Sequence, residues 1–121
     1  IVPPCGPRTK PKALNVGLAC ARGDIVAVFD AEDRPSPEQP REAAQAFLEG
    51  GARLAVVQAP LATHPDQKGW IAAQFRLEYA MHFGVWLPMI ARLGWPLPLG
   101  GTSNYFRRVW LERALGWDPY N

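Results

Sequence analysis

The feature that most constrains the fold is a short uncharged run that ends in a cluster of acids. Residues 25–29 read Ile-Val-Ala-Val-Phe, mostly β-branched and aromatic, with no polar alternation. Such a run suits a strand buried on both faces of a parallel sheet. Asp30, Glu32 and Asp33 follow directly. Because open α/β sheets bind ligands at the carboxyl ends of their strands, the sequence predicts a ligand site here.

These acids need a positive partner, because three like charges so close together repel one another. A divalent cation with oxygen ligands is the usual partner. The alternative is a surface turn whose acids cap the following helix. The acids by themselves favour neither interpretation.

Composition narrows the class of protein. A chain of 121 residues, 48% hydrophobic and 20% charged, is globular and forms one compact domain or part of one. A net charge of +2, with dispersed basic residues, argues against nucleic acid as a partner. No stretch qualifies as a transmembrane helix, since the best candidate, residues 80–99, contains His82, Arg92 and three prolines.

Hydrophobic periodicity predicts alternating helices and strands in the first half of the chain. A helix over residues 12–22 precedes the strand. A second helix over 36–49 starts with Ser36 as its N-cap and Gln39 closing a capping box, and Gly50-Gly51 ends it. A β-rich run over 54–58 follows, so strand, helix and strand predict a parallel βαβ unit.

The second half begins with an amphipathic helix. Apolar and aromatic residues recur at helical spacing over residues 70–90, and Pro88 should kink that helix. Its aromatic side chains are expected to pack a core, and contact with a membrane interface is the minority interpretation because the basic face is thin. A small polar stretch over 100–104 then leads to a short strand over 105–108 and a helix over 109–115.

Three weak features converge on one edge of the predicted sheet. The acids lie at a strand end, and Lys12 and Asn15 lie on the helix just before that strand. In the stretch 100–104, glycines let backbone approach a ligand and short side chains offer hydrogen bonds. Each feature alone is more often structural. Together they predict a site for an anionic, metal-bound ligand such as a nucleotide diphosphate.

Four segments in this order resemble those of a known family: Lys10-Pro11-Lys12-Ala13-Leu14-Asn15, Phe29-Asp30-Ala31-Glu32-Asp33-Arg34-Pro35, Val57-Gln58-Ala59-Pro60 and Gly100-Gly101-Thr102-Ser103-Asn104-Tyr105-Phe106-Arg107-Arg108. The chain resembles the family 2 glycosyltransferases, especially the processive, membrane-embedded branch related to cellulose and hyaluronan synthases. The resemblance implies a GT-A fold, a Rossmann-like α/β sandwich. It also implies that a nucleotide sugar binds through an Asp-x-Asp motif with Mg²⁺ or Mn²⁺.

The resemblance assigns roles by position. Asp30 matches the first acid of the metal-binding motif and Glu32 the second, while Asp33 is an additional acid that could replace Glu32 as a ligand. Lys12 and Asn15 match the family's Lys-Ala-x-Asn segment, which lies against the nucleotide. The segment before an Arg-Arg pair on the acceptor side is matched by Gly100, Gly101, Thr102, Ser103 and Asn104.

The resemblance also implies the reaction. An inverting, metal-dependent hexosyltransferase of polysaccharide biosynthesis would move a sugar from a UDP-sugar donor to a saccharide acceptor. Its base comes from a Thr-Glu-Asp motif expected beyond Asn121, so the catalytic residue stays unknown and the 121 residues alone should be inactive. Residues 1–60 are expected to form the nucleotide-sugar-binding half, and residues 61–121 the acceptor-side half, truncated before the base.

The chain is therefore expected to be a central, soluble fragment of a longer protein. That protein is expected in the bacterial inner membrane, with this part on the cytoplasmic side. Uncovered sheet edges predict a homo-oligomer. A non-catalytic sensor domain for nucleotide sugar and metal is the alternative. A sugar nucleotidyltransferase would need a glycine-rich loop near its start, and a receiver domain would need a lysine late in the chain; neither pattern is present.

Overall fold

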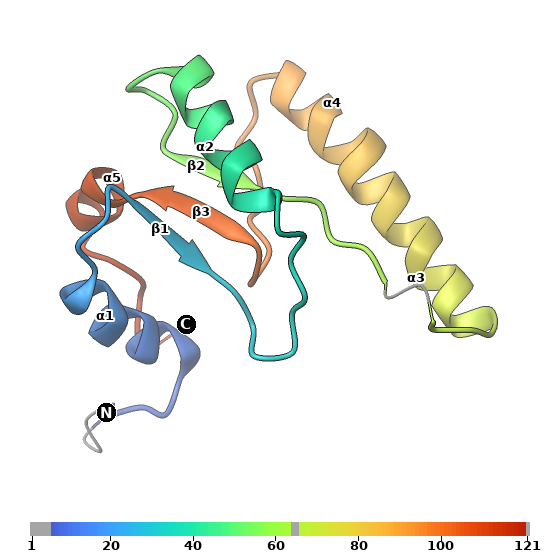
Figure 1. Ribbon diagram of the computed structural model, residues 1–121, viewed down its shortest axis with the longest axis horizontal. Helices are drawn as coiled ribbons and strands as arrows, with labels where there is room; N and C mark the ends of the chain where they lie inside the picture. Colours follow the sequence, from blue (N-terminus) through green and yellow to red (C-terminus); the bar gives the residue numbers. More distant parts are fainter. Residues whose placement is uncertain (1–5, 64–65, 121) are drawn as a thin grey trace.

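The structure, a computed structural model, describes residues 6–63 and 66–120. Figure 1 shows a small sheet with helices around it, and a long helical segment beside it. The elements follow in this order: α1 (Lys10–Cys20), β1 (Ile25–Val28), α2 (Gln39–Gly50), β2 (Val56–Gln58), α3 (Trp70–Met81), a π-helical segment η1 (His82–Trp86), α4 (Leu87–Arg92), β3 (Asn104–Arg107) and α5 (Arg108–Arg113).

The sheet has three strands in the order β1-β3-β2. The central strand β3 is antiparallel to both neighbours, with Phe106 opposite Val26 on one side and Val56 on the other. β1 and β2 therefore run in the same direction and α2 connects them, as the βαβ prediction required. The two strands are not hydrogen-bonded to each other, because β3, from much later in the chain, lies between them. The hydrogen-bonded pairs of the sheet are therefore antiparallel, and the prediction of a parallel sheet is wrong. The fold class is α/β, with an antiparallel sheet.

The prediction that the first strand is buried on both faces is also wrong. β1 is at the edge of the sheet. Val28 is buried in it, whereas Ala27 is exposed. The uncharged run over residues 25–29 therefore predicted the strand correctly, but it did not predict that the strand lies at the edge of the sheet.

The second helix, α2, begins later than its sequence signals indicate. Its N-cap is Glu38, which makes no side-chain capping hydrogen bond. Ser36 instead starts a turn, in which its carbonyl oxygen accepts a 3.0 Å hydrogen bond from the Gln39 N–H. The capping box over 36–39 is thus absent, because these residues form the turn that leads into the helix. At the other end Gly51 stops the helix with a φ of 66°, as predicted.

The core lies between α2 and the sheet. Ala43 and Phe47 of α2 pack with Ala59 and with Tyr105 of β3, and all four are at least 92% buried. Phe29 meets the Tyr105 ring edge-on, with 5.8 Å between centroids. The spacing of four residues between Ala43 and Phe47 puts both on one face of the helix, which explains why this face covers the sheet.

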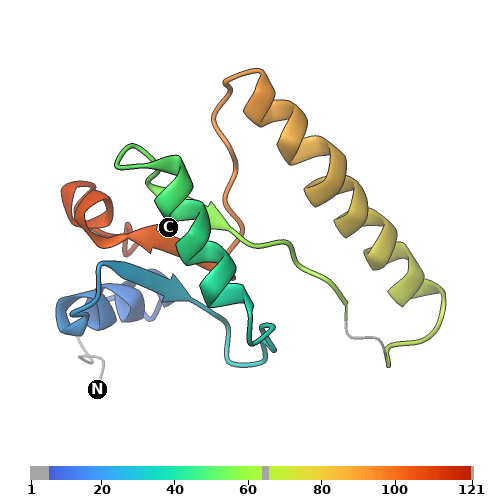
Figure 2. The same ribbon diagram turned by 45° about the horizontal axis from the view of Figure 1, so that its top comes forward.

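Residues 70–92 form a continuous helical arm that stands beside the sheet (Figures 1 and 2). The π-helical turn over 82–86 directly precedes Pro88, whose ring and missing N–H disfavour a regular α-helical turn there. Pro88 thus interrupts the helix, as predicted. The aromatic residues of the arm, however, do not pack a core: Trp70 is 78% and Trp86 49% exposed. Among the described residues, no helix is long and apolar enough to cross a membrane.

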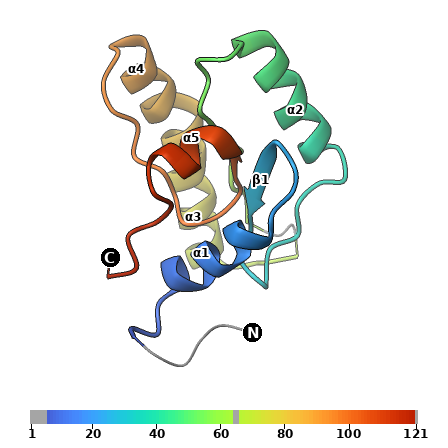
Figure 3. The ribbon, with the colours of Figure 1, turned by 90° about the vertical axis from the view of Figure 1, so that its left-hand side faces the viewer.

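The first helix is shifted from its predicted range of 12–22 by two residues. It starts at Lys10, and Ala21, in extended conformation, ends it. The segment after α5 returns to this helix, where Thr9 Oγ1 donates a 2.6 Å hydrogen bond to the Pro119 carbonyl. Figures 1 and 3 show α1, α5 and this last segment together at one end of the molecule.

Candidate functional site

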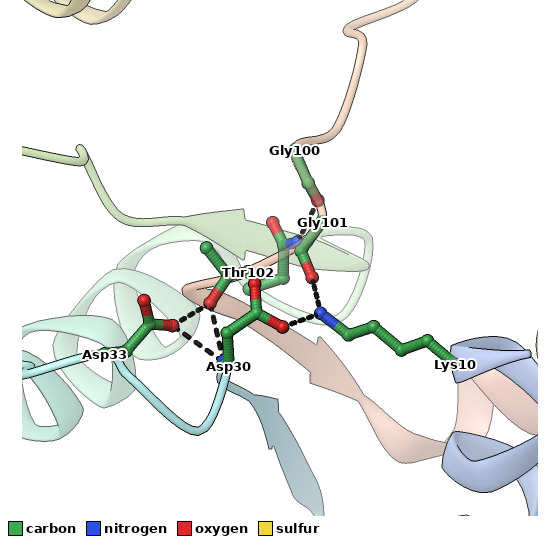
Figure 4. A network of polar contacts seen from close by, with 7 residues as sticks. Lys10, Asp30, Asp33, Gly100, Gly101 and Thr102 are labelled. Carbon is green, nitrogen blue, oxygen red and sulfur yellow. Dashed lines mark hydrogen bonds and ion pairs between the residues drawn. The ribbon is translucent and has the colours of Figure 1, made fainter.

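Two of the acids after β1, Asp30 and Asp33, lie against the glycine-rich segment before β3 (Figure 4). The strand register explains this, because Asn104 is opposite both Val28, the last residue of β1, and Gln58, the last residue of β2. The carboxyl ends of β1 and β2 and the start of β3 therefore share one edge of the sheet. Two features that are 70 residues apart in the sequence meet there, as the sequence predicted.

Asp33 links the loop after β1 to the segment 100–104 by hydrogen bonds. Its carboxylate accepts a 2.7 Å hydrogen bond from the Asp30 N–H and another from the Thr102 hydroxyl. The same hydroxyl oxygen accepts a 3.1 Å hydrogen bond from the Asp30 N–H. Thr102 is 9% exposed, so these bonds form at the inner side of the loop. Asp33 thus holds the loop in place, and one of its oxygens is committed to that role.

Lys10 supplies the positive charge. Its Nζ forms an ion pair with Asp30 Oδ1 and donates a 2.7 Å hydrogen bond to the Gly101 carbonyl. The side chains of Lys10 and Asp30 are 41% and 36% exposed, so a ligand from solvent can reach both. Lys10 joins α1, the loop after β1 and the segment 100–104 at one point, as Figure 4 shows.

Sequence reasoning assigned the basic role to Lys12 and missed Lys10. Residues two apart on a helix are about 200° apart around its axis, so both lysines cannot face the same way. Lys12 Nζ lies on the side of Gly6, 3.9 Å from where a Cβ on that glycine would be. Its contact with a nucleotide stays a prediction. The sequence Lys10-Pro11-Lys12 offered two lysines for this role. Only the position at which α1 starts shows which of the two lysines faces Asp30.

The structure does not bring Asn15 to the acids. Its Nδ2 donates to the Trp117 carbonyl at 2.7 Å, and its Oδ1 accepts from the Trp117 N–H at 2.9 Å. This side chain fixes the last described segment to α1. Its role toward a nucleotide likewise remains a prediction.

The segment 100–104 is held tightly. Asn104, 97% buried, donates from Nδ2 to the Gly100 carbonyl at 2.6 Å, and the carbonyl of buried Ser103 accepts from the Ala59 N–H at 2.9 Å. A Cβ on Gly100 would lie 2.6 Å from Nε2 of Gln58. A side chain at position 100 would therefore have to displace the end of Gln58, and glycine avoids this where β2 and this segment approach closely.

The Arg-Arg pair after this segment has a structural role. Arg107 lies at the opposite end of β3, where its Nη2 donates to the carbonyls of Phe47 and Gly51 at 3.1 and 2.9 Å. A cation there complements the carboxyl end of α2. Arg108 donates from Nε to the Gly23 carbonyl at 2.8 Å. Both arginines therefore support the fold, away from the acids.

The three acids do not converge on one point. Within residues 6–63 and 66–120, no group of three or more His, Cys, Asp or Glu side chains is arranged to hold a metal ion. Asp33 points inward and Asp30 meets Lys10. Glu32 is exposed and lines a neighbouring cavity. Since Mg²⁺ is usually held by one or two carboxylates together with substrate phosphates, Asp30 and Glu32 fit a metal that the ligand itself helps to bind.

Comparison with known proteins adds one finding. The family described as Glycosyl transferase family 2 matches residues 6–111, which include every candidate site residue named above. No curated protein and no solved structure matched the chain.

Proposed function

Because the chain belongs to glycosyl transferase family 2, we propose that it binds the nucleotide-diphosphate sugar in a metal-dependent, inverting transfer of a hexose to a saccharide acceptor. UDP-sugar is the proposed donor. The observation that carries the proposal is the network in which Lys10 meets Asp30 and Gly101, at the edge of the sheet where β1 and β2 end and β3 begins. An exposed ammonium beside a carboxylate is suited to a ligand that carries both phosphates and a cation.

The chemistry follows from charge. When a sugar leaves a nucleotide diphosphate, negative charge grows on the leaving phosphate oxygens, and a fixed cation stabilises it. Lys10 would bind these oxygens as a charged hydrogen-bond donor. Asp30 and Glu32 would hold Mg²⁺ or Mn²⁺, which when bound would neutralise charge on the same oxygens. Asp33 and Thr102 would keep Asp30 in position by fixing its backbone.

The remaining parts of the proposal concern the whole enzyme. The base that an inverting transfer requires would come from the family's Thr-Glu-Asp motif, which these 121 residues do not contain. We further propose that residues 1–60 supply most donor contacts and residues 61–121 the acceptor side. We also propose that the protein works at the cytoplasmic face of a bacterial inner membrane; the exposed apolar side chains of the arm over 70–92 support contact with a membrane surface.

Calorimetric titration of the 121-residue chain with UDP, with and without Mn²⁺, tests the donor site. UDP should bind more tightly with Mn²⁺, and Asp30→Asn should remove that gain. Glu49→Gln is the matched control, because Glu49 is an exposed carboxylate near the other end of α2. The proposal is contradicted if UDP binds equally well with and without Mn²⁺, or if Asp30→Asn binds UDP with Mn²⁺ as tightly as the unchanged chain.

A transfer assay tests the assignment of the base. Radiolabelled UDP-glucose, UDP-N-acetylglucosamine and UDP-galactose should each give no product with the isolated chain, since loss of a general base removes about 10²–10⁴ in rate. Product formation that disappears in Asp30→Asn would show that the base lies within these residues.

A further inference from the structure

The helix that carries Lys10, α1, is not held in place by the core. The structure describes α1 over its whole length, and none of its residues is buried. Since apolar burial is the main force that fixes one element against another, the place of α1 depends largely on polar contacts. Lys10 makes such contacts with Asp30 and Gly101, inside the candidate site. Other contacts of α1 lie outside that site.

The segment 116–119, which follows α5, forms hydrogen bonds with α1 at both its middle and its start. Asn15 pairs with the backbone of Trp117 in both directions, because its Nδ2 donates to the carbonyl at 2.7 Å and its Oδ1 accepts from the N–H at 2.9 Å. Thr9, directly before the helix, donates to the Pro119 carbonyl at 2.6 Å. The segment therefore runs along α1 toward the end that carries Lys10 (Figures 1 and 3).

Thr9 uses its hydroxyl for this contact instead of capping its own helix. It is the N-cap residue of α1, where a threonine side chain usually accepts a hydrogen bond from an N–H of the first turn. Thr9 makes no such bond, and its hydroxyl donates to Pro119. The first turn of α1, which contains Lys10, is therefore attached to the segment 116–119.

The segment 116–119 is in turn fixed to the sheet. The Trp117 ring meets the ring of Phe106 in β3 edge-on, with 5.5 Å between centroids. Gly116 has a φ of 79°, and a Cβ at this position would overlap Oδ1 of Asn15. Glycine thus permits both the turn and the close approach to α1. A continuous set of contacts therefore joins β3, through Trp117 and Asn15, to the helix that carries Lys10.

We propose that Asn15 and Thr9 are positioning residues for nucleotide binding. They attach α1 to the segment 116–119, and they thereby hold the ammonium of Lys10 at Asp30 and Gly101. The inference rests on the proposed function, in which Lys10 binds the phosphates of the donor. It gives Asn15 a role other than the one that the family resemblance implies, because Asn15 acts through Lys10 and does not touch the nucleotide.

Calorimetric titration with UDP and Mn²⁺ measures the effect of each contact. Asn15→Ala and Thr9→Val should each weaken binding about two- to tenfold, the factor that corresponds to loss of an ordinary hydrogen bond. Thr9→Ser should restore the affinity of the unchanged chain, because serine keeps the hydroxyl. Gln45→Ala is the matched control, since it removes an exposed side-chain amide that hydrogen-bonds to Glu49 on α2. Unchanged affinity in Asn15→Ala and Thr9→Val overturns the inference, even if both variants are less stable.

Combination with Lys10→Met separates positioning from direct contact with the nucleotide. If Asn15 acts through Lys10, Asn15→Ala should cause no further loss of affinity in a chain that already carries Lys10→Met. An equal loss in both backgrounds overturns the inference, because Asn15 would then contact the ligand itself. Where circular dichroism shows that Asn15→Ala does not fold, the comparison of Thr9→Val with Thr9→Ser in the two backgrounds decides.

NMR without ligand separates this inference from the proposed function. In the ¹⁵N-labelled 121-residue chain, Asn15→Ala and Thr9→Val should shift the amide signals of Asp30, Gly101 and Thr102 in the direction in which Lys10→Met shifts them. Such shifts uphold the role of both residues in holding Lys10 even where UDP fails to bind and the proposed function is lost. Signals that stay at their original positions overturn the inference whether or not UDP binds.

Discussion

Replacing Lys10 with methionine should weaken nucleotide binding much more than it destabilises the fold. Methionine keeps a long apolar stem but removes the ammonium that contacts Asp30 and Gly101. Because both charged side chains are more than a third exposed, solvent screens their ion pair, and pairs of this kind contribute about 0–1 kcal/mol. The free energy of unfolding should therefore fall by no more than about 1 kcal/mol.

The loss in free energy of nucleotide binding should be larger than the loss in free energy of unfolding, because the ammonium of Lys10 would contact a highly charged ligand. A hydrogen bond to a charged group contributes about 1.5–3 kcal/mol. For Lys10→Met this corresponds to an increase of about 10- to 150-fold in the Kd for UDP with Mn²⁺. Raising the ionic strength should narrow the difference between the two proteins, since exposed charges are screened by salt.

Calorimetry measures the Kd, and urea unfolding followed by circular dichroism measures the stability. Arg41→Met is the matched control, because it removes a cation from an exposed ion pair on α2. Lys12→Met tests the lysine that the family pattern favours. The reasoning is refuted if Lys12→Met abolishes binding while Lys10→Met binds normally. It is equally refuted if Lys10→Met loses several kcal/mol of stability at unchanged affinity, since Lys10 would then be purely structural.

Three further substitutions test the fold around the site. Burial raises the pKa of the Tyr105 phenol above 10.0. The folded state therefore favours the neutral phenol, and the protein should lose stability as the pH rises from about 10 through the folded-state pKa. Alkaline unfolding followed by circular dichroism should begin at higher pH in Tyr105→Phe. Phe47→Ala should cost about 3–5 kcal/mol in urea unfolding, because Phe47 is 97% buried in the core, and a cost below 1 kcal/mol would contradict that core. Gly100→Ala should cost only about 1 kcal/mol in thermal unfolding, because the new Cβ meets the mobile end of Gln58; unfolding of the whole domain would contradict it.

Local signals predicted much of this structure. The β-branched run ending in Asp30 is a strand that leads into a site, as its composition indicated, and Gly51 stops α2 with a positive φ. The convergence of the acids with the segment 100–104 was also predictable. Each of these depends on residues close in sequence or on the rule that strand ends meet at one edge of a sheet.

The features that the sequence did not predict depend on contacts between distant residues, which sequence periodicity does not encode. Ser36 has the chemistry of an N-cap, but its carbonyl and its hydroxyl accept hydrogen bonds within the turn at 36–39, before the helix begins. A shift of two residues in the start of α1 decided that Lys10, and not Lys12, meets Asp30. The aromatic spacing over 70–90 is the same for a buried stripe and for one that faces a groove. Only the placement of the arm distinguishes them.

The strand order has a consequence for how the protein is made. β3 is synthesised after β1 and β2, yet among the described residues it is the strand to which both of them are hydrogen-bonded. The helices can form from local contacts as the chain emerges, but pairing of Ile25 with Arg107 must close a long loop, which is slow. Until then β1 and β2 lack the strand with which both of them pair, and unpaired strand edges of this kind favour aggregation. The candidate site is completed by the same strand, because Thr102 and Gly101, which contact Asp33 and Lys10, lie directly before β3. A nascent chain that lacks β3 therefore lacks the candidate site as well.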